Sequence, residues 1–247
     1  MAIKIKKPED IALMVEGGKI TALALRKVLD AAKTGAVLAD LDKIAEEIII
    51  TSGAKPSFKM VEDYKFTTCL NVNEGIVHGI PNNYALRDGD VLSVDLGAFY
   101  KGFHTDLSYS VEIATNKEQK FLQAGENALN AAIAACTIGK HIGDISNSIQ
   151  QIIQKAGYTV STELVGHGVG KDLHEDPYIP GYGKKNTGPE IKEGMVFAIE
   201  VIYQKGSPKL ALERDGWTLR TADRSLSGLF EHTVAVTKNG SVVITKL

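Results

Sequence analysis

The chain has few cysteines, little net charge and no long hydrophobic run. Its two cysteines, Cys69 and Cys136, are too few for a disulfide framework or a four-cysteine zinc site. A formal net charge of −2 gives no general attraction to nucleic acid or to an anionic membrane. No segment approaches the roughly 18 consecutive apolar residues that a membrane-spanning helix needs. We therefore expect no membrane insertion and no specific binding of nucleic acid.

The N-terminal sequence MAIKIKKPED also lacks the apolar segment of a secretory signal. Together with the scarcity of cysteine, this favours a cytoplasmic protein. The composition, 44% hydrophobic and 23% charged residues, is typical of a globular protein with a sizeable core.

Two pairs of segments resemble each other at an almost constant spacing. Residues 35–53 and 139–157 match at an offset of 104, and residues 87–97 and 192–202 match at an offset of 105. Because the two matches occur in the same order, an internal duplication accounts for them better than chance.

Each half of the chain reads as two helices followed by strands, with an acid, Asp95 or Glu200, at the same point of one strand. The expected helices span residues 9–33 and 35–53 in the first half, and 117–137 and 139–157 in the second. We predict one α+β domain over residues 1–247, built from pseudo-repeats of roughly 9–113 and 117–238. The two halves are expected to share a site on a pseudo-twofold axis.

The stretch VLSVDLGAFYKGFHTDLSYSV, residues 91–111, predicts a β-hairpin with its turn near residues 100–102. Side chains on a strand alternate between two faces, so Asp95 and Asp106 share one face. A turn centred between residues 100 and 101 places them directly opposite, and a shift by one residue makes them diagonal neighbours. Like charges so close are destabilising, and a shared proton or a cation would offset the repulsion.

Two further acids lie in strand-like runs, Glu200 in FAIEVIY (197–203) and Glu231 in LFEHTVAV (229–236). His78, His167 and His174 occur in glycine-rich turns. Each residue alone is more often a solvated, paired or turn residue. Together, four carboxylates and a histidine favour two divalent cations about 3.5–4 Å apart. A proton-sharing aspartate pair is the alternative, but it leaves Glu200, Glu231 and His167 unexplained.

These residues lie in motifs that resemble one known family. The motifs are HGIP (78–81), DLGAFYKGFHTD (95–106), GHGVGKDLHEDP (166–177), EGMVFAIE (193–200) and DGWTLRTADRSLSGLFEHTVAVT (215–237). In this order they resemble type I methionine aminopeptidases, within the pita-bread metallohydrolase superfamily, over nearly the whole chain. The resemblance implies the pita-bread (creatinase/aminopeptidase-like) fold, in which two pseudo-twofold-related halves pack helices on a curved, mainly antiparallel sheet.

The resemblance also implies roles for individual residues. Two divalent ions, with Co, Mn, Fe, Zn and Ni all compatible, would be held by Asp95, Asp106, His167, Glu200 and Glu231. A monovalent cation is a further expected cofactor. A metal-bound water or hydroxide would attack the peptide, with Glu200 as acid/base and His174 stabilising the tetrahedral intermediate. His78 would contact the peptide nitrogen of the leaving group.

The implied activity is removal of the initiator methionine from nascent proteins, with preference for a small second residue. Besides His78 and His174, the residues expected to bind the methionine end of the substrate are Cys69, Tyr64, Trp217, Leu173 and Phe197. Cys136, in contrast, is expected to be a buried small apolar residue.

The sequence departs from the family pattern near the pocket. The family usually has a GYHGFP-like loop, and here residues 60–66 read MVEDYKF, with Val61 and Glu62 in place of an aromatic residue and a histidine. Val201 follows the ligand Glu200, where proline is usual. These departures bear on the pocket rim, the rate and the tolerance for the second substrate residue.

Two alternative functions are compatible with the same fold. One is an aminopeptidase of the Xaa-Pro type, against which the DGWT…EHT segment argues. The other is a non-catalytic binding module, which typically loses metal ligands, whereas all five positions are filled here.

The resemblance also implies the partners of the protein. The expected partner is the nascent polypeptide, with the ribosome near its exit tunnel as a second one and a monomer as the oligomeric state. Lys4, Lys6 and Lys7 form a small basic cluster suited to the ribosome, or simply a solvated terminus.

Overall fold

Antiparallel strand pairing joins the two halves of the chain into one sheet. The structure is a computed structural model that describes residues 3–247. Its helices are α1 (Pro8–Ala31), α2 (Leu38–Thr51), α3 (Gln119–Ala135), α4 (Ile142–Lys155) and a short 3-10 helix, η1 (Phe58–Met60). The four long helices begin and end within three residues of the predicted bounds, so the predicted helices are confirmed.

The strands of the first half are β1 (Lys55–Pro56), β2 (Thr68–Val72), β3 (Gly75–Val77), β4 (Val91–Tyr100) and β5 (Phe103–Glu112). Those of the second half are β6 (Thr159–Val160), β7 (Val165–Gly168), β8 (Glu175–Pro180), β9 (Val196–Gln204), β10 (Leu210–Leu212), β11 (Leu219–Thr221), β12 (Ser227–Thr237) and β13 (Gly240–Val243).

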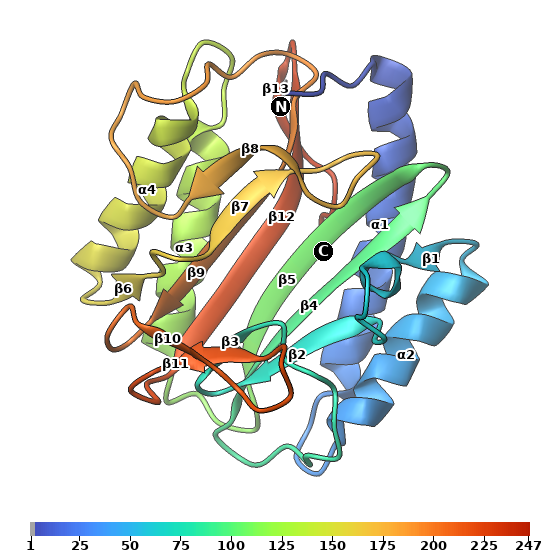
Figure 1. Cartoon of the computed structure of the whole chain (residues 1–247), viewed down its shortest axis with the longest axis vertical. Coiled ribbons are helices and arrows are strands. Elements are labelled where there is room, and N and C mark those ends of the chain that lie inside the picture. The colour runs from blue at the N-terminus through green and yellow to red at the C-terminus, as the bar shows by residue number, and fades with distance from the viewer. Residues whose placement is uncertain (1–2) are drawn as a thin grey trace.

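The large sheet has ten strands. Its order is β1, β4, β5, β12, β9, β7 and β8, with β2 paired to β4, β6 to β9 and β13 to β12 (Figure 1). A small sheet of β10, β11 and β3 lies across its lower end in that view. All strand pairs in the described part of the chain are antiparallel.

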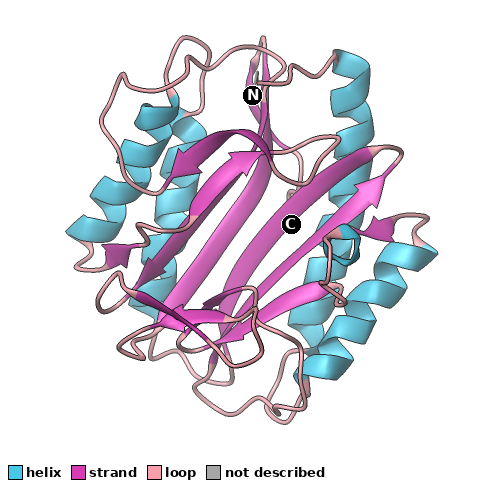
Figure 2. Ribbon diagram, viewed as in Figure 1, coloured by secondary structure: helices cyan, strands magenta, loops and turns pink. Residues whose placement is uncertain are grey.

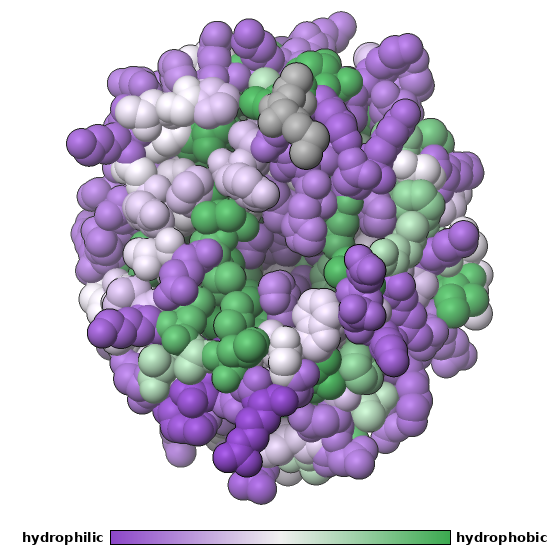
Figure 3. All heavy atoms as spheres, in the orientation of Figure 1, coloured by the Kyte–Doolittle hydropathy of each residue, from purple (hydrophilic) through white to green (hydrophobic). Residues whose placement is uncertain are grey.

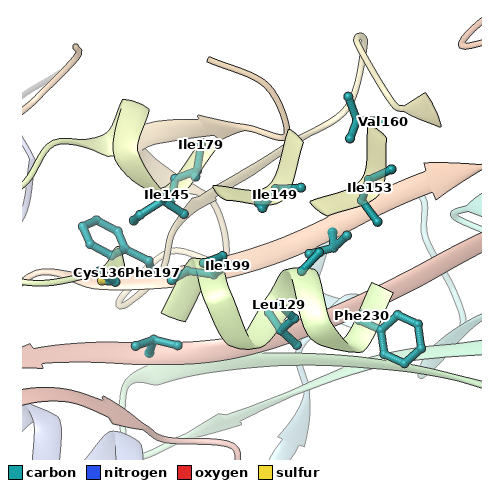
Figure 4. Packing of buried hydrophobic residues seen from close by; sticks show 14 of the residues in the cluster. Leu129, Cys136, Ile145, Ile149, Ile153, Val160, Ile179, Phe197, Ile199 and Phe230 are labelled. Carbon is teal, nitrogen blue, oxygen red and sulfur yellow. The ribbon is translucent and has the colours of Figure 1, made fainter. Parts of the chain in front are cut away.

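The two helix pairs cover one face of the sheet, one pair per half (Figure 2). Helix α4 shows why, because Ile142, Ile145, Ile149 and Ile153 recur at helical spacing and form one apolar stripe. This stripe packs with α3 and with the alternating apolar residues of β9 and β12 (Figure 4). The pair α1–α2 packs in the same way on β4 and β5.

Glycines end the second helix of each pair. Gly53 and Gly157 follow α2 and α4 with φ of +80° and +85°, the left-handed conformation that glycine adopts without steric cost. Both positions match the predicted glycine caps. The division of residues 1–247 into two pseudo-repeats of one domain stays a prediction.

The N-terminal arm, residues 3–7, is tied to the sheet. The Lys6 N–H donates to the Gly194 carbonyl at 2.7 Å, and the Lys6 side chain is buried. The proposed basic cluster of Lys4, Lys6 and Lys7 is therefore wrong as a surface feature, and only Lys4 and Lys7 are exposed. Among residues 3–247, no helix is long and apolar enough to cross a membrane.

Candidate active site

The face of the sheet opposite the helices carries the predicted acids. Its register forms a row across four strands through Asp95, Ser108, Glu231 and Glu200, each paired with the next. Directly paired residues on one face have Cβ atoms about 4.5–5.5 Å apart, so three acids and a serine are close neighbours.

A second row lies two residues along the strands and therefore on the same face. Asp106 on β5 pairs with Gly97, and His167 on β7 pairs with Ala198. Sheet register thus brings together all five predicted metal ligands from five strands. One carboxylate oxygen each of Asp106 and Glu231 and one ring nitrogen of His167 lie within 4.8 Å of one another.

The register also decides the open question about the hairpin. Its turn is centred between Lys101 and Gly102, both at positive φ, rather than one residue earlier. Asp95 therefore faces Ser108, and Asp106 is its diagonal neighbour. This is the second of the two predicted arrangements.

Ser108 is a site residue that the sequence did not single out. Its Oγ lies 2.9 Å from Asp95 Oδ1 and 2.8 Å from Glu231 Oε2. A hydroxyl has one proton, so it donates to only one of these carboxylates at a time. Its position on the same strand face as Asp106 was visible in the sequence, but a serine on a strand is no signal of a site.

His167 is oriented as a metal-ligating histidine. Its Nδ1 lies 2.9 Å from the Gly168 carbonyl oxygen, which only accepts, so Nδ1 carries the proton. Nε2 then presents a lone pair toward Asp106 Oδ2 and Glu200 Oε1, each 3.9 Å away. Burial lowers the pKa of His167 to about 3, which keeps the ring neutral.

The four acids carry no protein counter-charge. Burial raises the pKa of Asp95 to about 7, although the Ser108 hydrogen bond opposes this. Burial, reinforced by the charge of Asp95, raises the pKa of Glu231 to about 8. The pKa values of Asp106 and Glu200 are also raised, first by burial and then by the neighbouring carboxylates.

The cluster fits divalent cations. Glu231 Oε1 is buried without a hydrogen-bond partner, and no lysine or arginine lies among the described residues that line the pocket. Buried carboxylates without partners are costly, and cations remove that cost. Carboxylate oxygens with one imidazole suit hard or borderline divalent ions.

The acids form the floor of a cavity of about 250 Å³. In the space-filling view of this side, the molecule is hollowed near its centre, with apolar residues gathered beside the hollow (Figure 3). The walls bring together the predicted residues Cys69, Tyr64, Leu173, Trp217, His78 and His174, with Phe58, Val61 and Val77 as additional lining.

Aromatic side chains contact each other edge to face in this wall. Tyr64 and Trp217 contact edge to face with ring centroids 5.0 Å apart, and Tyr64 donates its hydroxyl to the Thr68 carbonyl at 2.8 Å. Val61 lines the cavity, whereas Glu62 is exposed and does not replace the family histidine within the pocket.

The DGWT motif holds this wall against the His78 loop. Asp215 accepts the N–H groups of Trp217 and Thr218 at 2.9 and 2.8 Å, which forms a tight turn. Thr218 Oγ1 in turn accepts the Ile80 N–H at 3.2 Å. The motif therefore couples Trp217 to the segment that follows His78.

Phe197 does not line the cavity, which corrects the prediction. It lies on the helix side of β9, fully buried beside Cys136 (Figure 4). Strand alternation explains this, because Phe197 and Glu200 are three residues apart and point to opposite faces. Cys136 is buried in the same cluster, as predicted.

His174 and His78 stand over the acids. The rings of His174 and His167 contact edge to face with centroids 4.4 Å apart. Both side chains are exposed at the cavity mouth, and partial loss of solvent there lowers the pKa of each, with the charge of His174 lowering that of His78 further. Neutral imidazoles in this position can donate hydrogen bonds to a bound peptide.

A curved antiparallel sheet backed by two helix pairs, with a buried acidic cluster on its open face, defines a pita-bread metallohydrolase. Comparison with known proteins gives the family. The chain belongs to metallopeptidase family M24, whose model matches residues 12–238. The family and fold class predicted from the sequence are therefore confirmed.

Several relatives match over their whole length. The chain is 38% identical to methionine aminopeptidase 1 of Bacillus subtilis and 40% identical to the methionine aminopeptidase of Mycoplasma capricolum, covering 98% of each. These alignments span 98% and 99% of this chain. The crystal structure of a methionine aminopeptidase from Thermotoga maritima superposes with a TM-score of 0.97 at 37% identity, with both chains fully covered.

More distant structures share the fold alone. Prolidase from Pyrococcus furiosus superposes with a TM-score of 0.80 at 23% identity, over 98% of this chain and 65% of that one.

Proposed function

We propose that the protein is a methionine aminopeptidase, which removes the initiator methionine from nascent polypeptides whose second residue is small. One observation carries this proposal: four carboxylates and a neutral imidazole form the floor of a pocket with an aromatic wall. The names of the relatives agree with it. Because nascent chains are made in the cytoplasm, the proposal places the enzyme there.

The proposed metal centre holds two divalent ions. Asp95, Asp106, His167, Glu200 and Glu231 would hold them, since these side chains converge on the pocket floor without a lysine or arginine partner. When bound, such ions supply Lewis acidity, which polarises a peptide carbonyl and makes water a better nucleophile at neutral pH. Which ion serves in the cell depends on availability as well as on these ligands.

Glu200 is the proposed acid/base. Its side chain is 13% exposed, compared with 6% for Asp106 and 5% for His167. It is thus more open to the cavity than its neighbours, and in the metal-free protein burial and the neighbouring carboxylates raise its pKa.

The two upper histidines act on the peptide itself. His174 would donate a hydrogen bond to the carbonyl oxygen as negative charge develops there, and its neutral ring makes this donation specific to one nitrogen. His78 would contact the peptide nitrogen of the leaving group. The methionine side chain would lie against Tyr64, Trp217 and Cys69, because a thioether packs well against ring edges.

The expected monovalent cation has a suitable set of oxygens at the start of β12. Ser227 Oγ lies 2.6 Å from the Gly75 carbonyl oxygen and 3.0 Å from that of Asn73. The Asn73 carbonyl also accepts the Ser227 N–H at 2.9 Å, so a cation bound here would share the three oxygens with these hydrogen bonds. The monomeric state and the ribosome contact stay predictions.

The test compares three peptides on the purified protein reloaded with Mn²⁺ or Co²⁺. We expect methionine release from Met-Gly-Met-Met, none from its N-acetylated form, and no cleavage of a Xaa-Pro peptide. Metal analysis should give two ions per chain. Cleavage of the Xaa-Pro peptide alone would favour the proline-directed alternative, and no cleavage with any divalent ion would favour a binding module. A Glu200→Gln variant should retain its fold but lose activity.

A further inference from the structure

The N-terminal arm sends one charged side chain beneath the loop that carries His174. Lys6 Nζ lies 2.6 Å from Glu175 Oε2, and the two side chains are only 5% and 1% exposed. The Lys6 ammonium also donates to the Lys4 carbonyl at 3.3 Å. This is a buried ion pair that the proposed chemistry does not use.

Glu175 is the residue directly after His174, where β8 begins. Its second oxygen, Oε1, accepts the Asp172 N–H at 3.3 Å and lies 3.4 Å from Lys4 Nζ. Lys4 also forms an ion pair with Asp172. One carboxylate thus joins the N-terminal arm to both ends of the segment Asp172–Glu175.

The His174 ring itself has little to hold it. Among residues 3–247 we find no hydrogen bond to this ring, and its ring contact is with His167, at an interplanar angle of 64°. Its orientation therefore depends on the backbone on which it is mounted. Glu175 anchors that backbone one residue away.

The space for Lys6 is made by a glycine. A Cβ built on Gly170 would overlap Lys6 Cε and lie 3.0 Å from Lys6 Nζ and 2.9 Å from Glu175 Oε1. The Gly170 carbonyl accepts the His104 N–H at 2.7 Å, which holds the loop over the sheet at that point. Lys6 therefore fits only while residue 170 lacks a side chain.

We propose that Lys6 is a positioning residue, which acts through Glu175 to hold His174 over the acidic cluster. This inference rests on the proposed peptidase activity. Losing one member of a buried ion pair leaves the other charge unpaired, and the cheapest relief is movement of the loop toward water. Movement of His174 by about 1 Å is enough to weaken catalysis by one to two orders of magnitude.

The test is Lys6→Met, which retains the length of the side chain and removes its charge. We expect kcat to fall about tenfold with KM changed less than about twofold, because the stabilisation lost belongs to the transition state. The Ki of a tetrahedral phosphonate analogue of methionine should rise by a similar factor, while affinity for free methionine stays constant. Lys7→Met, an exposed lysine on the same arm, is the matched control and should behave as wild type.

A double-mutant cycle separates positioning from general stability. In a His174→Ala background, Lys6→Met should lower kcat by less than about twofold, because the group it positions is gone. An equal tenfold loss in that background would overturn the proposal, as would wild-type kcat in Lys6→Met. Bound metal, measured on each variant, should stay unchanged.

Two further variants test the same proposal if Lys6→Met does not fold. Gly170→Ala displaces Lys6 and keeps both charges, and Glu175→Gln keeps the size of the anchor; both should reproduce the kcat loss. If all three unfold, the pair is structural and the proposal is wrong. Failure of the peptidase assignment looks different, because wild-type protein would then release no methionine at all.

Discussion

Ser108→Ala offers a sharp test of the metal centre because it changes no proposed ligand. The hydroxyl lies between two carboxylates, 2.9 Å from Asp95 Oδ1 and 2.8 Å from Glu231 Oε2, and is fully buried. When cations neutralise the acids, the hydroxyl holds one carboxylate in place for coordination. Alanine removes that hydrogen bond and leaves space smaller than a water molecule.

The magnitude follows from the role of hydrogen bonds behind metal ligands. Their removal typically weakens metal affinity by about 10–100-fold, or roughly 1.4–2.7 kcal/mol. Because Ser108 contacts two of the four acids, we expect the upper part of that range. The metal-free protein should lose about 1–2 kcal/mol of stability, the usual effect of removing a hydrogen-bonded buried hydroxyl.

The assay is calorimetric titration of metal-stripped protein with Mn²⁺, together with thermal unfolding in chelator. Ser110→Ala is the matched control, since Ser110 is a buried serine on the same face of β5. Its Oγ contacts Ser93 Oγ at 2.7 Å and the Leu229 carbonyl at 2.8 Å instead of an acid. The control should lose comparable stability and retain its Mn²⁺ affinity. If Ser108→Ala bound Mn²⁺ within twofold of wild type, the proposed ligand geometry would be wrong.

Three other changes test the site from different sides. Asp95→Ala and Glu231→Ala should each fold but lose bound metal and at least about 1000-fold of methionine release; full activity in either would contradict the ligand assignment. Without metal, burial raises the pKa of Asp95 and Glu231 to about 7 and 8, so the folded state holds protons that the unfolded state has released. Stability in chelator should therefore fall as the pH rises from about 4.5 to 8, by roughly 3–4 kcal/mol for each of the two groups. Urea unfolding measures this fall, added Mn²⁺ should oppose it, and a rise of stability with pH in chelator would refute the cause. Trp217→Ala should raise KM for a methionine peptide about tenfold with little change in kcat, and equal KM values would remove Trp217 from the substrate pocket.

Much of the fold could be read from periodicity. The isoleucines of α4 and the glycines after α2 and α4 are local signals, so helix bounds were predicted to within three residues. The alternation of residues 91–111 likewise predicted the β4–β5 hairpin and the shared face of Asp95 and Asp106. Local chemistry decides such features, and the sequence displays it directly.

The register of distant strands could not be read in this way. Nothing in the sequence places β12 between β5 and β9, and it is this order that brings Glu231 beside Ser108. Strand and turn patterns singled out the four acids and His167 as candidates, and the family motifs then assigned them as one ligand set. Family analogy then misled at Phe197, where strand alternation alone was the better guide.

The buried Lys6 was also beyond sequence reasoning. A lysine in an N-terminal run of charged residues is normally solvated, and its partner Glu175 is 169 residues away. The only residue whose type depends on this contact is Gly170, which leaves room for the lysine. Because glycine is common in loops whatever packs beside them, Gly170 does not reveal the contact before the structure is known.

The internal repeat explains which strand positions form the site better than it explains which residue types occupy them. Sheet register places Asp95 opposite Ser108 in the first half and Glu200 opposite Glu231 in the second. Since the repeat matches Asp95 with Glu200, the register in turn matches Ser108 with Glu231. Asp95 and Glu200 are thus equivalent and both acidic, whereas Ser108 and Glu231 are equivalent and only one of them is acidic.

The same register relates His167 to the first half. His167 lies opposite Ala198, and the equivalent position opposite Ser93 is occupied by Asn71. A symmetric site would offer two equal carboxylates and no distinct nitrogen ligand. Because hydrolysis needs different groups on the two sides of one peptide bond, we infer that the halves had to diverge at these positions. A search for repeats alone could therefore find Asp95 and Glu200 but not the residues that make the two sides of the site different.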